Sequence, residues 1–411
     1  MFLPQSDAGQ KMNWKVLSLI YLGITLNFVC LFCFFTLHNL YLSGDNFNHP
    51  PLLDEMSSLA LFDAPVIIIG AFLTYMVVKK INFISVMKII SVINVIVICF
   101  ILYIADFYKA DLCDFLMVIR FIQMLLIPPT LILPTIFCFS ITHEKHYHKL
   151  SYFTPFAMAF AGLVCSFTKN ELVSLEIKSC FVLSIFSSLV SFLCFFVSKG
   201  MKYHSFYDAE INRKSITEMD RNAIKLALFL CGFLFAAGIV YAIYFSNPYV
   251  NEILIMVITP ANLPPIALHC FLLVVFLPIV SNLYKSYGLS NTMILSAIGV
   301  VIVGTLSFFN PSMTKNTFLI IKIIHGISCS IMMAPLYWVV YRLSTLTGKL
   351  YKPMLWTIGG FSFSLVLRSL FFFLPQNVSP LFTGCIIKLV GLLAFILLVP
   401  KINGLLSAYE K

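Results

Sequence analysis

Residues 84–105 read ISVMKIISVINVIVICFILYIA, an apolar run in which Lys88 is the single charged residue. A helix needs about 20 apolar residues to cross the hydrocarbon core of a bilayer. An α-helix satisfies its backbone hydrogen bonds internally in lipid, whereas a membrane barrel would show short strands of alternating hydrophobicity. The run therefore predicts a membrane-spanning helix.

Eleven similar runs accompany it along the 411 residues. The twelve predicted spans lie near residues 14–42, 59–78, 84–105, 115–141, 150–168, 175–197, 223–246, 262–284, 290–309, 317–341, 353–374 and 378–400. Composition agrees, because 60% of the residues are hydrophobic and only 11% are charged, against about 25% charged in a soluble domain. We predict an all-α membrane protein with 12 transmembrane helices.

Lysine and arginine residues predict the orientation. With the N-terminus inside, eighteen of the 27 fall in cytoplasmic segments, as the positive-inside rule requires. The outer loops hold Lys109, Lys169, Lys178 and Lys315, and the spans hold Lys88, Arg120, Lys322, Arg368 and Lys388. We expect both termini in the cytoplasm and a location in a bacterial inner (plasma) membrane. The net charge is +10, but the basic residues lie between apolar runs and form no continuous patch. We therefore expect no nucleic acid partner.

The longest polar stretch predicts the domain organisation. It occupies residues 199–224, between the sixth and seventh spans. We expect it to be a cytoplasmic loop that joins two six-helix bundles, residues 1–198 and 225–411, since parallel repeats require a connection of this kind.

Faint internal symmetry supports the two bundles. Span four carries Arg120 and Gln123 three residues apart, and span ten carries Lys322 and His325 at the same spacing. Each pair lies on one helix face and is followed by a proline, Pro134 or Pro335. This pattern predicts that Lys322 and His325 occupy the places of Arg120 and Gln123 in the second half.

These features resemble the major facilitator superfamily, which has two six-helix halves and an Arg-x-x-Gln motif in span four. Arg120 and Gln123 match that motif, with Met124 in place of its following glycine. Lys79 and Lys80 keep the basic character of the signature between spans two and three but not its aspartate or second glycine. The resemblance implies the major facilitator fold and secondary transport by alternating access.

Within that superfamily, the chain resembles the drug:proton antiporter branch. The sequence Thr36-Leu37-His38-Asn39 is similar to the Thr-Ile-Val-Asn of that branch, although Phe34 replaces its acidic residue and span five keeps only Gly162 of its signature. This implies proton-coupled efflux of amphiphilic compounds. The alternative is import of a small anionic nutrient or metabolite, which the cations Arg120 and Lys322 and the scarcity of acids favour.

Ionisable residues within spans are the candidate substrate or coupling residues, since such residues are costly in lipid. Arg120, with Gln123 beside it, can bind an anionic group or act on a neighbouring acid, or its side chain can extend to the outer interface. Lys322 and His325 are the candidates of the second half. His325 can titrate near neutral pH or be a hydrogen-bonded packing residue.

Four further residues leave alternatives open. His269 follows Pro264 and Pro265 and can serve freed carbonyl groups or line the substrate path. Asp63 is the one carboxylate expected inside a span, and it is either a coupling residue or an interfacial residue at a helix start. Arg368 is a further candidate, and both its side chain and that of Lys388 can extend to the interface.

No other motif indicates a cofactor, metal or enzyme. The run His143-Glu144-Lys145-His146-Tyr147-His148 lacks a second ligand cluster, so we interpret it as a solvated inner loop. Cysteines such as Cys30 and Cys33 lie in or beside apolar runs and are interpreted as buried small side chains. We find no clustered catalytic residues and no G-x-x-x-x-G-K-[ST] loop. We expect a monomer in the lipid bilayer that binds a small-molecule substrate, with protons as the candidate coupling ion.

Overall fold

The computed structural model describes most of the chain, and every structural statement below refers to these residues. They are residues 14–42, 53–107, 112–142, 147–166, 173–199, 217–244, 265–280, 282–309, 315–347, 352–372 and 380–409.

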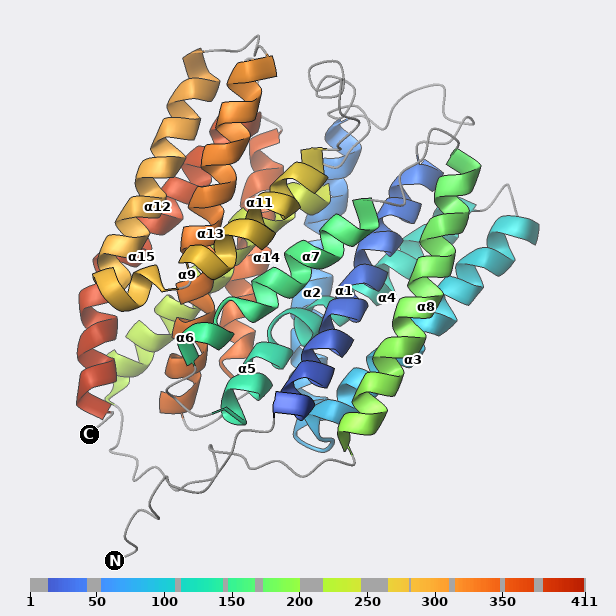
Figure 1. Cartoon of the computed structure of the whole chain (residues 1–411), viewed down its shortest axis with the longest axis horizontal. Helices are drawn as coiled ribbons and strands as arrows, with labels where there is room; N and C mark the ends of the chain where they lie inside the picture. The colour runs from blue at the N-terminus through green and yellow to red at the C-terminus, as the bar shows by residue number, and fades with distance from the viewer. Residues whose placement is uncertain are drawn as a thin grey trace, which may run out of the picture.

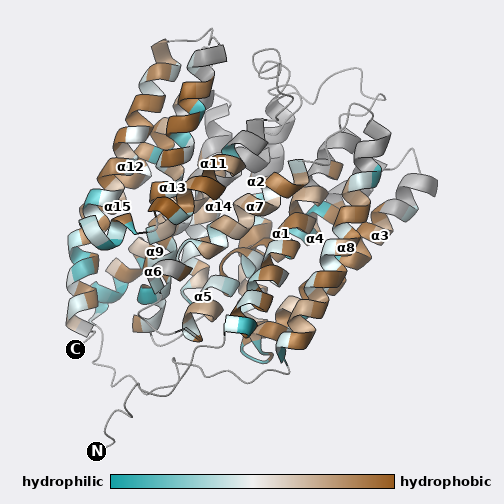
Figure 2. Ribbon diagram, viewed as in Figure 1, coloured by the Kyte–Doolittle hydropathy of each residue, from teal (hydrophilic) through white to brown (hydrophobic). Residues whose placement is uncertain are grey.

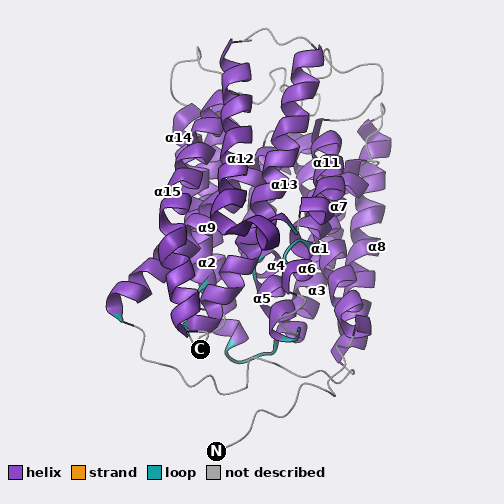
Figure 3. Ribbon diagram, turned by 60° about the vertical axis from the view of Figure 1, so that its left-hand side comes forward, coloured by secondary structure: helices purple, strands orange, loops and turns teal. Residues whose placement is uncertain are grey.

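Fourteen helices and no strand occur in this described part (Figures 1 and 3). They are α1 (Trp14–Leu42), α2 (Leu53–Val78), α3 (Phe83–Phe107), α4 (Leu112–Leu131), α5 (Leu133–Ser140), α6 (Tyr147–Leu150), α7 (Phe153–Ser166), α8 (Val173–Lys199), α9 (Glu218–Tyr244), α11 (Pro265–Val280), α12 (Leu283–Phe309), α13 (Lys315–Leu346), α14 (Met354–Phe372) and α15 (Pro380–Tyr409). Because α4 and α5 form one broken span and α6 is a short connecting helix, twelve spans remain, and the predicted all-α fold is confirmed.

Length and composition make eight of the described helices suitable to cross a membrane. Three more, α7, α11 and α14, are apolar but shorter in their described parts. The predicted boundaries err mainly at the ends: α2 begins at Leu53, not near residue 59, and α15 continues to Tyr409, not to residue 400. These polar ends extend helices beyond the apolar runs from which the boundaries were predicted.

Two interruptions follow from proline and glycine. The span made of α4 and α5 breaks at Ile132, which follows Pro128 and Pro129, as expected for residues that cannot donate a backbone hydrogen bond. Near its start, α12 changes direction at Gly288, whose φ of 77° suits glycine. The apolar part of α12 therefore begins after Gly288, close to the predicted start at residue 290.

The outer surface of the bundle is apolar. Large side chains such as Leu397, Phe309 and Val182 are 82%, 73% and 69% exposed. Figure 2 shows hydrophobic residues along most of each helix and hydrophilic ones near the lower ends of α9 and α15. A surface of this kind suits contact with lipid and not with water. The eleven cysteines whose side chains are described are free, and all of these except Cys99 are buried, which agrees with their interpretation as packing residues.

The helices pack as two equivalent sets. In the first, α1 contacts α7 and α8, α2 contacts α4, and α3 contacts α8. In the second, α9 contacts α14 and α15, α11 contacts α13, and α12 contacts α15. Each contact in one set has its counterpart in the other. We call α1–α8 the N-terminal half and α9–α15 the C-terminal half.

The two halves meet along α2 against α14 and α7 against α11. The start of α1 and the end of α15 lie at the same end of the bundle (Figure 1), as an even number of spans requires. We call this the inner end, after the predicted cytoplasmic location of the termini. Residues 200–216 of the predicted central loop lie outside the described residues, so the domain boundaries at 199 and 225 stay predictions.

Candidate functional site

Asp63 on α2 and Arg120 on α4 form a buried ion pair in the N-terminal half. Arg120 Nε donates to Asp63 Oδ1 at 2.9 Å, and Arg120 Nη2 donates to Asp63 Oδ2 at 2.6 Å. The side chains are 0% and 2% exposed for Asp63 and Arg120 respectively. The planar fork of arginine matches a carboxylate in this two-bond geometry. Arg120 therefore does not extend to the outer interface, and Asp63 is not an interfacial residue.

Close packing of α2 against α4 supports this pair. Gly70 lies two turns beyond Asp63, and a Cβ atom at Gly70 would stand 2.5 Å from the backbone oxygen of Leu125. Glycine is therefore needed for the helices to approach this closely. Asp63 lies ten residues into α2, about 15 Å along the helix axis, so the pair is deep within the bundle.

A second polar contact lies next to the pair. Gln123, one turn after Arg120, reaches Asn94 Oδ1 on α3 at 3.5 Å. Further into the half, Ser91 Oγ donates to Asn27 Oδ1 at 3.2 Å, and Ser191 Oγ donates to the Gly23 oxygen at 2.8 Å. These contacts join α1, α3, α4 and α8, so the N-terminal half holds a chain of buried polar groups beside the ion pair.

A different cluster lies in the C-terminal half, on α11, α13 and α15. Lys388 Nζ stands 3.1 Å from His325 Nε2 and 2.9 Å from Cys329 Sγ. The rings of His269 and His325 are 5.3 Å apart. The four side chains are buried, with Lys388 at 1% exposure. We call His269, His325, Cys329 and Lys388 the C-terminal cluster.

The chemistry of this cluster has two features. Since an ammonium group only donates, His325 Nε2 accepts from Lys388, which places the ring proton of a neutral His325 on Nδ1. The donor atoms of His269, His325 and Cys329 all lie within 4.8 Å of one another, and imidazole and thiolate are metal-binding types. Sequence reasoning missed both Cys329 and the inward position of Lys388.

Lys388 does not extend to the interface, the alternative that its sequence position left open, because it is buried and bonded to α13. Its position, eight residues into α15 and about 12 Å from the helix start, was the available signal. Cys329 follows His325 by one turn and shares its face. Lys322 is also buried, at 6% exposure, one turn before His325.

Several predicted residues lie outside the described part. Nothing is described of the side chain of Arg368, although its backbone is in α14. The side chains of Thr36, His38 and Asn39, on which the antiporter resemblance depends, are likewise not described, although their backbone is in α1. Residues 143–146 of the histidine run lie wholly outside the described residues. The double proline Pro264-Pro265 precedes or starts α11 and does not interrupt its described part.

The contacts revise the predicted equivalence between the halves. Arg120 faces α2, and in the C-terminal half His325 faces the corresponding helix, α11. Gln123 faces α3, and Ser328 faces its counterpart α12 by donating to the Ser296 oxygen at 2.8 Å. The structure therefore pairs Arg120 with His325, one turn beyond Lys322.

Aromatic side chains join the halves at the inner end. The Tyr147 and Tyr341 hydroxyl groups are 3.1 Å apart. The Phe139 ring stacks on Tyr341 with 4.7 Å between centroids. Nearby, Ser151 Oγ lies 3.2 Å from the Tyr284 hydroxyl group. These contacts hold α5, α6 and Ser151, which follows α6, against α12 and α13 of the other half.

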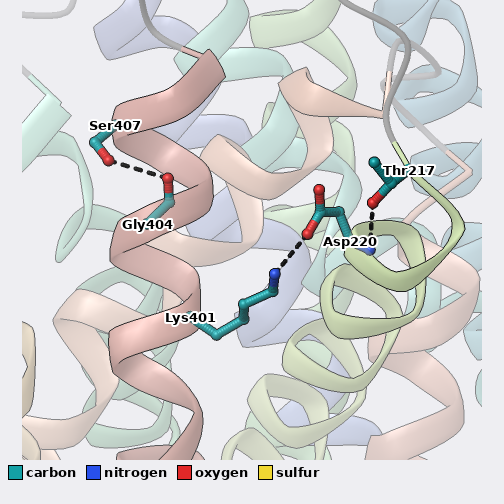
Figure 4. A network of polar contacts seen from close by, with 5 residues as sticks. All are labelled: Thr217, Asp220, Lys401, Gly404 and Ser407. Atoms are coloured by element: carbon teal, nitrogen blue, oxygen red, sulfur yellow. Dashed lines mark hydrogen bonds and ion pairs between the residues drawn. The ribbon is translucent and has the colours of Figure 1, made fainter.

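A partly exposed ion pair at the same end contrasts with the buried one. Lys401 Nζ on α15 lies 2.6 Å from Asp220 Oδ1 on α9, and these side chains are 41% and 15% exposed. Figure 4 shows the pair beside Thr217, whose Oγ1 accepts from the Asp220 backbone N–H at 3.1 Å.

No family sequence model and no curated protein sequence matches the chain. Solved structures do match. The xylose transporter XylE from E. coli, in a partially occluded inward open conformation, superposes with a TM-score of 0.68 and 14% identity, over 94% of this chain and 97% of that one. The nucleoside transporter NupG gives 0.57 and 13%, over 96% and 100%. FucP, a major facilitator superfamily transporter, gives 0.56 and 11%, over 93% and 99%. The chain therefore has the fold of the major facilitator transporters.

Proposed function

We propose that this protein is a secondary transporter that moves a small organic solute across the membrane by alternating access. Two packed halves of equivalent helices, joined along α2–α14 and α7–α11, suit this mechanism. The inner-end contacts of Tyr147 and Tyr341 are available to break and re-form between states.

We further propose that Asp63 and Arg120 couple transport to protons. The buried two-bond ion pair carries this proposal. Among the residues whose side chains are described, Asp63 is the one buried carboxylate. Protonation of Asp63 would neutralise it and release Arg120 from α2, which changes the contact between two helices of one half. One structure with the same fold is a proton:xylose symporter.

The test is transport in sealed proteoliposomes without ATP. For wild-type protein we expect solute accumulation under an imposed pH gradient. For Asp63→Asn we expect loss of accumulation while solute exchange between the two sides continues, since exchange needs no net proton movement. Strict dependence on ATP would overturn the transporter class, and accumulation by Asp63→Asn would overturn the coupling role.

Export of amphiphilic compounds is the second candidate. This candidate rests on the resemblance of span one and span four to the drug:proton antiporters. Arg120 and Gln123, which carry the resemblance in span four, are both buried in the bundle. Direction separates the candidates: inverted and right-side-out vesicles, loaded with dyes or with labelled organic acids, report which solute moves and which way.

A further inference from the structure

The C-terminal cluster brings three side chains of metal-binding type together from two helices. His269 lies on α11, and His325 and Cys329 lie on α13. One nitrogen of each imidazole and the sulfur of Cys329 all lie within 4.8 Å of one another, and the three side chains are buried. Imidazole nitrogen and cysteine thiolate are the ligands that zinc and related transition-metal ions prefer.

The spacing along α13 fits a chelating pair. His325 and Cys329 are four residues apart, so their side chains lie one above the other on the same face of the helix. His325 Nε2 stands 3.7 Å from Cys329 Sγ. Zinc bonds of about 2.1 Å to nitrogen and about 2.3 Å to sulfur, at a tetrahedral angle, place two such ligand atoms about 3.6 Å apart. The observed separation therefore matches one edge of a zinc tetrahedron, and His269 supplies a third ligand from α11.

Lys388 already directs a positive charge at the same two atoms. Its Nζ stands 3.1 Å from His325 Nε2 and 2.9 Å from Cys329 Sγ. An ammonium group only donates, so the nitrogen and the sulfur that would bind a metal act as acceptors toward a cation. The flexible four-carbon stem of lysine allows the ammonium group to move away from them. Lys388 and a metal ion would therefore compete for these two atoms.

We infer that the C-terminal cluster is a binding site for a transition-metal ion of the zinc type, with His269, His325 and Cys329 as ligands and Lys388 as the competitor of the ion. This site goes beyond the proposed transport function, since ligation needs only these side chains. His269 and His325 each make a further interaction, which suits ligation, because metal-binding histidines usually hold an outer partner with the second ring nitrogen. A bound ion would join α11 to α13 and displace the contact of Lys388 that joins α15 to α13.

The experiment is titration of the purified full chain with Co²⁺, followed by competition with Zn²⁺. Co²⁺ bound by a thiolate gives a sulfur-to-metal charge-transfer band in the near ultraviolet, and a tetrahedral Co²⁺ ion gives intense visible bands. We expect both signals to saturate at about one ion per chain and to disappear when Zn²⁺ replaces Co²⁺. The histidine run at 143–148 contains no cysteine, so it cannot produce the sulfur band.

Variants locate the site. Cys329→Ala should abolish the sulfur band, and His269→Gln or His325→Gln should raise the Kd for Co²⁺ about tenfold or more. The matched control is Cys270→Ala, which removes a buried cysteine next to His269. The sulfur of Cys270 faces α7, where a Cβ atom at Gly162 would stand 2.7 Å from it, so this variant should keep the band. If Cys329→Ala does not fold, Cys329→Ser keeps the size of the side chain and should lose the band as well.

A further variant tests the competition with Lys388. Lys388→Leu removes the ammonium group and adds no ligand atom. Its Kd for Co²⁺ should fall about tenfold or more, because a positive charge beside the site disfavours a cation. The control is Lys88→Leu, which removes a lysine on α3 whose Nζ lies over the Phe196 ring, 5.8 Å from its centroid, and should bind as wild type does. Weaker binding by Lys388→Leu would overturn the role of Lys388 as a competitor.

The outcomes separate this inference from the proposed function. Absence of the sulfur band in folded wild-type protein, or an equal band in the folded Cys329 variant, overturns the inference. Co²⁺ binding with visible bands alone also overturns it, since such binding does not use Cys329. A cobalt spectrum that needs Cys329 supports the inference even where proteoliposomes show no transport, a result that would count against the function alone.

Discussion

In the N-terminal half, α2 meets α4 through Asp63 and Arg120, an anion and a cation bound by two hydrogen bonds. In the C-terminal half, the corresponding helices α11 and α13 meet through His269 and His325, and Lys388 adds a cation from α15. The same helix pairs thus carry buried polar groups in both halves. In the first half the described partner of the cation is a carboxylate, whereas in the second half the described hydrogen-bond partners of Lys388 are an imidazole and a thiol. This difference is the basis for proposing that proton coupling resides in Asp63 and Arg120 of the first half.

The largest effect on stability and transport is expected at the buried ion pair of Asp63 and Arg120. Arg120→Ala should lower the free energy of unfolding by about 3–5 kcal/mol and abolish transport, because it leaves Asp63 as an unpaired buried charge. Thermal unfolding and proteoliposome flux measure the two effects. Asp63→Asn/Arg120→Gln, which removes both charges, should recover most of the stability and none of the coupling. Unchanged flux in Arg120→Ala would remove Arg120 from the site.

The second prediction concerns Lys388, where removal of the charge should not lower the free energy of unfolding. Lys388→Met should leave the free energy of unfolding unchanged or raise it by about 1–4 kcal/mol, since it replaces a buried ammonium group, whose described partners are an imidazole and a thiol, with an apolar side chain of similar length. Thermal unfolding measures it, with Lys88→Met at a half-buried position of α3 as the control. A loss of stability as large as that of Arg120→Ala would show that Lys388 is compensated, and the contrast between the halves would fail.

Sequence reasoning predicted the fold better than the site, for a physical reason. The twelve spans follow from the cost of charge in lipid, which every run such as 84–105 displays. Asp63 and Arg120 could each be selected as charges within spans, but their pairing depends on the close approach of α2 and α4 at Gly70. Lys388 was misjudged because α15 is apolar on all sides, so its sequence does not reveal which face meets α13.

A smaller effect is expected where the halves touch at the inner end. Tyr147→Phe removes the hydrogen bond to Tyr341, worth about 1 kcal/mol, and should shift the population toward an inner-open state roughly fivefold, since a state that separates α6 from α13 lacks this bond. Distances between spin labels on the inner ends of α5 and α13 measure the shift. Tyr287→Phe, an exposed residue of α12, is the control. An unchanged distance distribution would exclude this bond from the inner closure.

The smallest effect on stability is expected at Lys401 and Asp220. Comparison of this pair with Asp63 and Arg120 shows how burial changes the energy of an ion pair. Its N···O distance of 2.6 Å equals that between Arg120 Nη2 and Asp63 Oδ2. Lys401, however, is 41% exposed, so water screens the attraction and solvates the partner when one charge is removed. Lys401→Ala should therefore lower the free energy of unfolding by about 1 kcal/mol or less and leave transport unchanged. Raising the salt concentration should weaken this pair and have little effect on Asp63 and Arg120. If Lys401→Ala cost as much as Arg120→Ala, distance and not burial would set the energy of both pairs, and the buried charges would lose their special status in the proposed mechanism.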